Sequence, residues 1–299
     1  TKSLLHKESD LFFDWYSPLF LSKKKNKKFK KKAKRILSQL YNRLNFPNSC
    51  FVHRDYHVQN LMKIKKKISV IVPCYNEQQT ILKIIRKIIN AKPKDKEIII
   101  VNDCSTDQTK NILDKLKFKN KIKIINHKKN FGKGKAIITG LKKVTGNIVI
   151  IQDADLEYDP KEYQKLIKPI IDGSYKVVYG SRVLGRKGKI INHSLAVKFR
   201  IITNYFLTKY SNILNNQSLT DAHTCYKVFD YNIIKNLNLT EEDFAFCPEV
   251  TTKLGNKNFK ILEVPISYKG RTYKQGKKIG IYDGLRALFV IIKYKFFMD

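Results

Sequence analysis

The sequence has few acidic residues, few cysteines and no long apolar run. Its 299 residues include 25 Asp and Glu against 60 Lys and Arg, which gives a formal net charge of +35. Hydrophobic residues make up 42% of the chain, as in ordinary globular proteins, so a wholly disordered chain is excluded. No uncharged apolar stretch approaches the ~18 residues that span a bilayer. We therefore expect a folded chain that is soluble or bound to a membrane surface.

The five cysteines are scattered and contain no Cys-x-x-Cys pair. Their odd number and irregular spacing disfavour both a disulfide framework and a zinc site. The first residues also lack the pattern of a secretory signal peptide. Together these features predict a cytoplasmic location.

The excess of positive charge favours an anionic partner, which can be nucleic acid, an acidic membrane face or a phosphorylated substrate. Lysines that merely decorate the surface explain much of the same excess. The densest run, Lys23 to Arg35, holds ten basic residues in thirteen. It is expected to be a solvated helix or an anion-binding arm.

The N-terminal segment carries a motif of its own. Residues 51–61 read FVHRDYHVQNL, in which an Asp and an Asn stand five residues apart, as in the catalytic loops of phosphoryl transfer. The motif resembles that of aminoglycoside-phosphotransferase-like sugar kinases, with Asp55 as base and Asn60 as metal ligand. The glycine-rich loop and ATP-binding lysine of a kinase are absent. We therefore predict a truncated, mostly helical kinase-like segment at residues 1–61, followed by a second domain at residues 62–299.

The second domain alternates short apolar runs with amphipathic stretches. We predict strands at 68–73, 97–101, 121–126 and 148–152, with helices at 80–90, 106–116 and 134–144 between them. This alternation is typical of an α/β fold whose mainly parallel sheet is covered on both faces. Ligands of such sheets bind at the carboxyl ends of the strands.

Acidic residues follow three of the predicted strands. Glu77 follows the first strand, Asp103 the second, and Asp153 and Asp155 the fourth. Carboxylates that meet at one edge of a sheet repel one another unless a cation or ligand donors lie among them. An oxygen-seeking divalent ion, Mg²⁺ or Mn²⁺, suits a carboxylate pair together with a diphosphate.

A resemblance to a known family rests on these motifs in order. VIVPCYNE, IIIVNDCSTDQT, NFGKGKAIITGLKKVTGNIVIIQDADLEYDP and VVYGSR resemble the signatures of a family-two glycosyltransferase. LTDAHTCYKVF and EVPISYKGRTYKQGKKIG resemble the dolichyl-phosphate mannose synthase branch. The resemblance covers about residues 66–299 and implies the nucleotide-diphospho-sugar transferase (GT-A, Rossmann-like) fold.

The resemblance also implies roles for individual residues. Donor-binding roles fall on Pro73, Tyr75, Glu77, Val101, Asp103, Asp153, Ala154, Asp155, Arg182, Lys227, Arg271 and Lys277. Catalytic roles fall on Asp155, Asp221 and Arg271, and metal-binding roles on Asp153, Asp155 and, as an added ligand, Glu157. The sequence departs from the family pattern where Asn102 replaces an Asp, Cys104 a Gly and Lys227 an Arg.

The implied activity is inverting transfer of a hexose from a nucleotide-diphosphate sugar, of the GDP-mannose or UDP-glucose type, to a polyprenyl phosphate. A phosphate acceptor is already ionised near pH 7 and needs no strong base. The nearest alternative is a saccharide-hydroxyl acceptor, which requires Asp221 or Glu249 as base. A sugar kinase acting through Asp55 and a basic nucleic-acid-binding protein are more remote alternatives, and we expect no nucleic acid partner.

Residues 195–210 place Leu195, Phe199, Ile202 and Phe206 on one helical face with basic residues beside it. Such a stripe fits a helix lying on an anionic membrane surface, or a helix facing the core. Residues 285–297 are a second candidate for an interfacial helix. We expect peripheral association with the cytoplasmic face of a membrane.

Overall fold

The computed structural model describes residues 10, 13–14, 17–43, 66–116, 122–186, 195–271 and 281–298. The chain divides into two compact units, Thr1–Lys63 and Ile64–Asp299. Asp55 and Asn60 lie outside the described residues, so the kinase-like assignment of the first segment stays a prediction.

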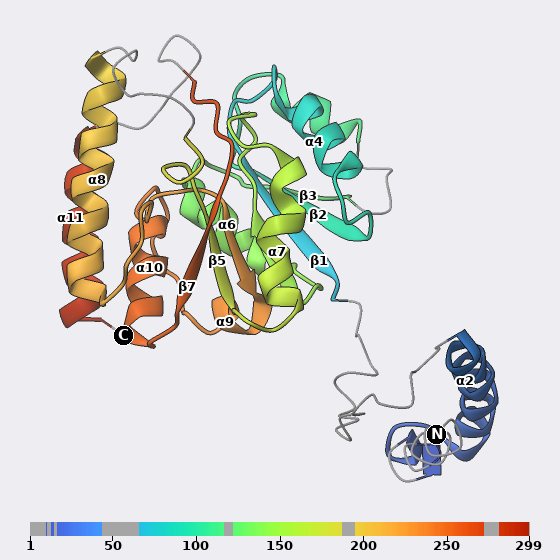
Figure 1. Cartoon of the computed structure of the whole chain (residues 1–299). Helices are drawn as coiled ribbons and strands as arrows, with labels where there is room; N and C mark the ends of the chain where they lie inside the picture. The colour runs from blue at the N-terminus through green and yellow to red at the C-terminus, as the bar shows by residue number, and fades with distance from the viewer. Residues whose placement is uncertain are drawn as a thin grey trace. The chain divides into compact units, whose positions relative to one another are not determined.

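The first unit is built around the lysine-rich run, which forms helix α2 (Lys23–Arg43) (Figure 1). Phe29 of α2 packs edge-on against Phe13, with 5.8 Å between the ring centroids. The Lys30 ammonium lies 2.5 Å from the carboxylate of Asp14. Most other lysines of α2 are exposed, so the run is a solvated helix with one face packed on the preceding residues.

The second unit contains a seven-stranded sheet in the order β3-β2-β1-β4-β6-β5-β7. The strands are β1 (Ile68–Cys74), β2 (Lys96–Asn102), β3 (Ile122–Asn126), β4 (Ile148–Ile151), β5 (Val177–Ser181), β6 (Lys227–Asp230) and β7 (Ile261–Pro265). All neighbouring pairs are parallel except those of β6, which runs antiparallel to both β4 and β5. The predicted mainly parallel sheet is therefore confirmed.

Helices cover both faces of this sheet (Figure 1). One face packs against α4 (Ile81–Asn90), α5 (Thr109–Asp114) and α7 (Tyr163–Ile171). The other face packs against α6 (Lys133–Leu141), α9 (Tyr231–Lys235) and α10 (Phe246–Asn256). β1 contributes side chains to the core on both faces of the sheet, because every residue in it is buried and successive side chains point to opposite faces.

Helix α4 shows how the sequence fixes this packing. Ile81, Ile84, Ile85 and Ile88 recur at the spacing of one helical face, and all four are buried. Ile89, which follows Ile88 in the same helix, is 38% exposed. Eight residues at about 100° each turn it about 80° away from Ile81, to the edge of the apolar stripe.

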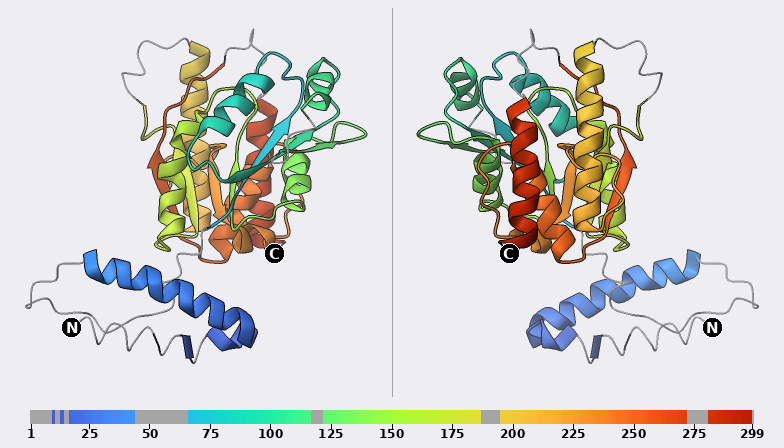
Figure 2. Two further views of the ribbon diagram at one scale, coloured as in Figure 1. Left: turned by 90° about the vertical axis from the view of Figure 1, so that its right-hand side faces the viewer. Right: turned by 90° about the vertical axis from the view of Figure 1, so that its left-hand side faces the viewer.

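Helices α8 (Leu195–Asn215) and α11 (Ile281–Phe296) lie side by side and pack on α10 (Figure 2). Each helix exposes an apolar stripe at helical spacing. Large exposed side chains are Phe199, Ile202, Tyr205, Phe206 and Ile213 on α8, and Tyr282, Leu285, Phe289, Ile292 and Phe296 on α11. The core-facing alternative for the α8 stripe is therefore wrong. Within the described residues, no helix has both the length and the apolar character needed to cross a membrane.

Candidate functional site

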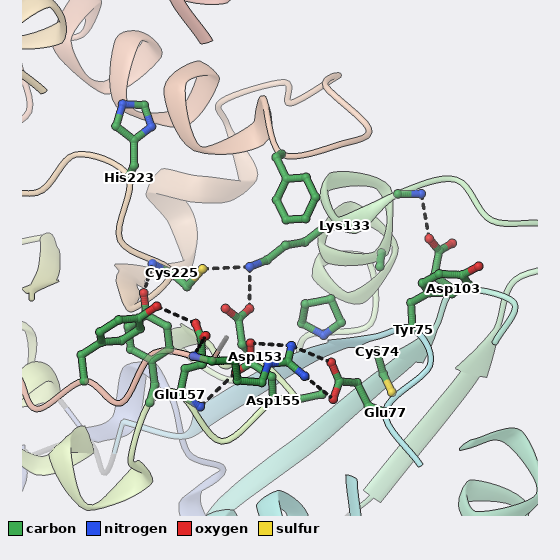
Figure 3. A pocket seen from close by; sticks show the side chains of 18 of the residues that line it. Cys74, Tyr75, Glu77, Asp103, Lys133, Asp153, Asp155, Glu157, His223 and Cys225 are labelled. Atoms are coloured by element: carbon green, nitrogen blue, oxygen red, sulfur yellow. Dashed lines mark hydrogen bonds and ion pairs between the residues drawn. The ribbon is translucent and has the colours of Figure 1, made fainter. Parts of the chain in front are cut away.

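A pocket of about 320 Å³ opens where β1, β2 and β4 end. Its volume lies at the lower end of the range for ligand pockets. The acidic residues predicted at the three strand ends all line it: Glu77, Asp103, Asp153 and Asp155 (Figure 3). Parallel strands bring their carboxyl ends to one edge of the sheet, which is why residues distant in sequence meet here.

The chain turns sharply after each of these strands. Asn76, Cys104 and Leu156 have φ angles of 53°, 57° and 65°, in the left-handed region. Asn tolerates this conformation, whereas a side chain such as Cys104 costs roughly 1–2 kcal/mol there. Cys104 stands where the family pattern has Gly, and its backbone still adopts the left-handed conformation that a glycine would favour.

Asp103 holds the loop that precedes α6. Its Oδ1 accepts from the backbone N–H of Phe131 at 2.9 Å, and its Oδ2 from that of Gly132 at 2.7 Å. His127 Nδ1 lies 2.7 Å from Oδ1. Gly132 has a φ of 102°, and an added Cβ would lie 2.6 Å from the carbonyl oxygen of Glu242. The loop therefore needs both the carboxylate of Asp103 and a glycine.

Lys133, the first residue of α6, reaches the centre of the pocket. Its Nζ lies 2.5 Å from Asp153 Oδ1 and 2.8 Å from Cys225 Sγ. Burial lowers the pKa of the ammonium, but the charge of Asp153, the neighbouring Cys225 and Cys247 and the hydrogen bond to Asp153 together outweigh burial and raise that pKa above its ordinary value. Lys133 is not among the site residues that the sequence predicts; its only signal is the Gly-Lys-Gly that opens a helix.

Asp155 lies in an excess of negative charge. Burial raises the pKa of its carboxyl group, the charges of Asp153 and Glu157 raise it further, and the pKa reaches about 7 although Arg271 opposes the rise. Its Oδ1 accepts from the backbone N–H of Glu157 at 3.1 Å. The carboxylates at this edge are thus only partly neutralised by the protein itself.

Arg271 connects two strand ends. Its Nη1 and Nη2 donate to the two oxygens of Glu77 at 3.1 and 3.0 Å, and Nη2 lies 3.0 Å from Asp155 Oδ2. Its Nε is buried and has no hydrogen-bond partner among the described residues. The guanidinium therefore retains an unused donor at Nε.

Glu157 holds the segment that carries Arg271. Its Oε1 accepts from the backbone N–H of Arg271 at 2.6 Å, and its Oε2 from the hydroxyl of Tyr268 at 2.7 Å. Both oxygens of the predicted added metal ligand are engaged in this way. In this arrangement Glu157 orients a loop.

Arg182 closes another side of the pocket. Its Nε and backbone N–H bind Asp221 Oδ2 at 2.7 and 3.0 Å, and Nη2 binds Oδ1 at 2.7 Å. Burial raises the pKa of Asp221, but the charge of Arg182 and its hydrogen bonds outweigh burial and lower it below its ordinary value. The guanidinium also lies 5.3 Å from the ring centroid of Tyr268.

The structure brings most of the predicted site residues together. Pocket-lining members are Pro73, Tyr75, Glu77, Asp103, Asp153, Ala154, Asp155, Glu157, Arg182 and Arg271. Two others do not line it: Val101 is buried in β2 within the core, and Asp221 lies behind Arg182. Lys277 falls outside the described residues.

Lys227 also lies apart from the pocket lining. The side chain is fully buried, and Nζ donates to the carbonyl oxygens of Ala222 and Thr224 at 2.9 and 2.6 Å. It stands 4.1 Å from the ring centroid of Tyr179. Burial lowers the pKa of this ammonium. In this arrangement Lys227 holds the loop that precedes β6.

The described residues contain no group of three or more His, Cys, Asp or Glu side chains placed to hold a metal. Asp153 and Asp155 alone provide a carboxylate pair, flanked by Lys133 and Arg271. Such a pair fits Mg²⁺ or Mn²⁺ only when a bound substrate supplies further oxygen ligands. The residues present therefore suit an ion that arrives with a diphosphate.

Comparison with solved structures confirms the fold. The chain is similar to glucosyl-3-phosphoglycerate synthase from Mycobacterium tuberculosis, solved with Mn²⁺, uridine-diphosphate and phosphoglyceric acid. The TM-score is 0.59 and the sequence identity 16%, over 78% of this chain and 79% of that one. At this identity the likeness shows the fold alone, and the predicted GT-A class agrees with it.

Comparison of sequences identifies the family. The chain is 28% identical over 232 residues to dolichol-phosphate mannosyltransferase from Pyrococcus furiosus, covering 77% of this chain but only 64% of that protein. It is 29% identical to UDP-N-acetylglucosamine–dolichyl-phosphate N-acetylglucosaminyltransferase from Methanococcus voltae, covering 77% of this chain and 96% of that protein. The model of glycosyl transferase family 2 matches residues 69–237, more than half of the chain. The chain therefore belongs to glycosyl transferase family 2.

Proposed function

We propose that this chain is an inverting glycosyltransferase that moves a hexose from a nucleotide-diphosphate sugar to a polyprenyl phosphate. The observation that carries the proposal is the agreement between two relatives. The Pyrococcus and Methanococcus proteins are named for different sugars, mannose and N-acetylglucosamine, but for the same kind of acceptor, dolichyl phosphate. The acceptor class is thus better supported than the donor, which stays a choice between the GDP-mannose and UDP-sugar types.

The charges of the pocket support a diphosphate donor. Glu77, Asp153, Asp155 and Glu157 are accompanied by the cations Lys133 and Arg271, while Arg182 is paired with Asp221. We propose that Asp153 and Asp155 hold Mg²⁺ or Mn²⁺ when the donor binds. Such an ion would stabilise negative charge on the departing nucleoside diphosphate.

The same geometry favours a phosphate acceptor over a saccharide hydroxyl. A hydroxyl needs a base to remove its proton, whereas a phosphate oxygen is already ionised near pH 7. Asp221 is a poor base, because Arg182 binds both its oxygens and lowers its pKa. Glu249 is buried and accepts hydrogen bonds from the backbone N–H groups of Thr240 and Glu241. Inversion then follows when a phosphate oxygen attacks the anomeric carbon opposite the leaving diphosphate.

A lipid acceptor requires access to a membrane surface. The exposed apolar stripes of α8 and α11 lie on neighbouring helices of a strongly basic chain. We propose that this helix pair rests on the cytoplasmic face of an anionic membrane, with its apolar side chains at the acyl boundary. Binding through this surface would give the pocket access to a polyprenyl phosphate in the membrane.

A donor and acceptor screen tests the proposal. The full chain is incubated with GDP-mannose, UDP-glucose or UDP-N-acetylglucosamine, each with a polyprenyl phosphate or a soluble oligosaccharide, in the presence of Mg²⁺ or Mn²⁺. We expect one donor to give a glycolipid whose anomeric configuration is opposite to that of the donor. Transfer to the oligosaccharide alone would contradict the proposed acceptor.

A further inference from the structure

Each aspartate proposed to hold a metal already has a cationic partner from the protein. Lys133 Nζ lies 2.5 Å from Asp153 Oδ1 (Figure 3). Arg271 Nη2 lies 3.0 Å from Asp155 Oδ2. A metal ion that bound these carboxylates directly would compete with both side chains for oxygen atoms. The competition is strongest at Asp155, whose Oδ1 also accepts from the Glu157 backbone.

Arg271 is suited to exchange its partners. It arrives from the segment after β7, whereas Glu77 and Asp155 follow β1 and β4, so its contacts join three separate parts of the chain. Its side chain is 21% exposed at the pocket. Its buried Nε has no hydrogen-bond partner among the described atoms. A phosphate oxygen can accept from an unused guanidinium donor, and arginine binds phosphates in a bidentate geometry.

The donor's charge explains when the exchange would occur. A diphosphate that enters alone meets an excess of carboxylates over cations: Glu77, Asp103, Asp153, Asp155 and Glu157 line the pocket against Lys133, Arg271 and Arg182, the last already paired with Asp221. A metal that enters alone must displace Arg271 from Asp155 and leave the guanidinium beside a divalent ion. When both enter together, the diphosphate takes the arginine and the metal takes the carboxylate. Like charges are then kept apart.

We infer that Arg271 is a resident counter-ion that competes with a divalent metal for Asp155 in the nucleotide-free protein and transfers to the donor's diphosphate on binding. Metal and nucleotide therefore bind cooperatively, and each raises the affinity of the other by the same factor. The inference rests on the proposed function only in taking a nucleoside diphosphate as the ligand of this pocket. Arg271 acts in it as a donor-binding residue.

Binding of Mn²⁺, followed by electron paramagnetic resonance, tests the inference without any sugar transfer. Free Mn²⁺ is titrated against the full chain alone and with UDP or GDP. For the wild type we expect the more suitable nucleotide to tighten Mn²⁺ binding at least tenfold. For Arg271→Gln we expect Mn²⁺ to bind the nucleotide-free protein about tenfold more tightly than it binds the wild type, with a smaller further gain from nucleotide.

The matched control is Arg286→Gln on α11. Arg286 also bridges two carboxylates, Glu241 and Asp243, at 3.0 and 2.8 Å, but it does not line the pocket. Its Mn²⁺ affinity should equal that of the wild type. If Arg271→Gln fails to fold, Arg271→Lys supplies the same test, because a lysine cannot bind both carboxylates in a planar fork and should give an intermediate affinity.

Two results would overturn the inference. Equal Mn²⁺ affinities of nucleotide-free wild type and of the Arg271 variants would show that the arginine does not compete. Absence of Mn²⁺ binding under every condition would remove the metal site itself. Neither result decides whether the enzyme transfers sugar to a polyprenyl phosphate, because the donor and acceptor screen measures that separately.

Discussion

Ser69 and Glu97 are register partners on the parallel strands β1 and β2, and the Ser69 hydroxyl donates a hydrogen bond of 2.5 Å to Glu97 Oε1. Thr145 donates to the same carboxylate from its backbone N–H at 2.7 Å, and Lys123 Nζ lies 3.0 Å from Oε2. Burial raises the pKa of Glu97, but these hydrogen bonds outweigh burial and lower the pKa to about 2. The pair lies at the start of the strands, away from the pocket.

This pKa predicts a defined loss of stability in acid. A carboxyl group whose pKa is lower in the folded state stabilises the fold above its unfolded pKa of 4.5, and the contribution disappears as the pH falls toward 2. The contribution is about 3 kcal/mol. In urea unfolding between pH 7 and pH 2.5, Glu97→Gln should lose less stability than the wild type. Glu242→Gln, which removes an exposed carboxylate, should follow the wild-type curve; coincidence of all three curves would contradict the prediction.

Gly132→Ala should destabilise the protein and impair the pocket. The added Cβ meets the Glu242 carbonyl oxygen at 2.6 Å at a φ of 102°, in the loop held by Asp103. We expect a loss of about 2–4 kcal/mol in the free energy of unfolding. Gly173→Ala is the matched control, because Gly173 has a φ of 84° but no atom within 4 Å of an added Cβ. It should cost only about 1 kcal/mol. Equal losses would show that the close approach is unimportant.

Asp221→Asn should free the Arg182 side chain from its position. The substitution keeps the shape of the side chain but removes the buried charge that holds the guanidinium, which costs about 3 kcal/mol in stability. We expect kcat/KM for transfer to fall at least tenfold. Urea unfolding and steady-state kinetics measure the two effects. Asp172→Asn, at an exposed carboxylate, should leave both the stability and the kinetics close to those of the wild type. Wild-type kinetics in Asp221→Asn would exclude a positioning role.

The apolar stripe of α8 should hold the protein on anionic vesicles after salt has removed the electrostatic attraction. Each basic residue near an anionic surface contributes about 1 kcal/mol, and salt screens this contribution. The double variant Phe199→Ser and Phe206→Ser should leave vesicles in 0.5 M NaCl at least tenfold more completely than the wild type. Co-sedimentation measures the bound fraction. Ile171→Ser, an exposed apolar residue on α7, should behave as the wild type. Identical sedimentation of all three proteins would refute the interfacial role.

A chain that begins at Met62 should keep its transferase activity. Every residue that lines the pocket lies between Pro73 and Arg271, within the second compact unit. Turnover of the shortened chain is compared with that of the full chain, and circular dichroism verifies folding. A loss of more than about tenfold, or 1.4 kcal/mol in the barrier, would show that residues 1–61 take part in the reaction.

The sequence predicted the central strands because their apolar runs are long and their partners are neighbours. β1, β2 and β4 begin and end within one residue of the predicted bounds. Helix α5 is shorter than predicted, Thr109–Asp114 instead of residues 106–116. At its start, Ser105 and Asp107 instead accept hydrogen bonds from backbone N–H groups of the turn after β1. The direction of β6 was not predictable, since four residues carry no sign of which strand they will pair with.

The site was predictable in its acidic half and much less in its basic half. Carboxylates that follow strands must meet at the sheet edge, whereas a cation is located only by its partners. Arg271 pairs with Glu77 across 194 positions of sequence, and Lys133 pairs with Asp153 from the first turn of α6. Glu157 shows the same limit: the sequence offered it as a metal ligand, but the folded chain engages it with Tyr268 and Arg271. In each case the side chain's role depends on a partner that is distant in the sequence.

The antiparallel direction of β6 determines which loops of the chain arrive at the ligand-binding edge of the sheet. In a wholly parallel sheet, only segments that leave a strand arrive at the ligand-binding edge. Because β6 runs against β4 and β5, the segment that enters it arrives at this edge as well, carrying Asp221, His223 and Cys225. The loops that follow β1, β2 and β4 thus supply the carboxylates that line the pocket, while the loop that precedes β6 supports Arg182. Substitutions in the incoming loop can therefore alter one side of the pocket while the acidic turns after β1, β2 and β4 remain unchanged.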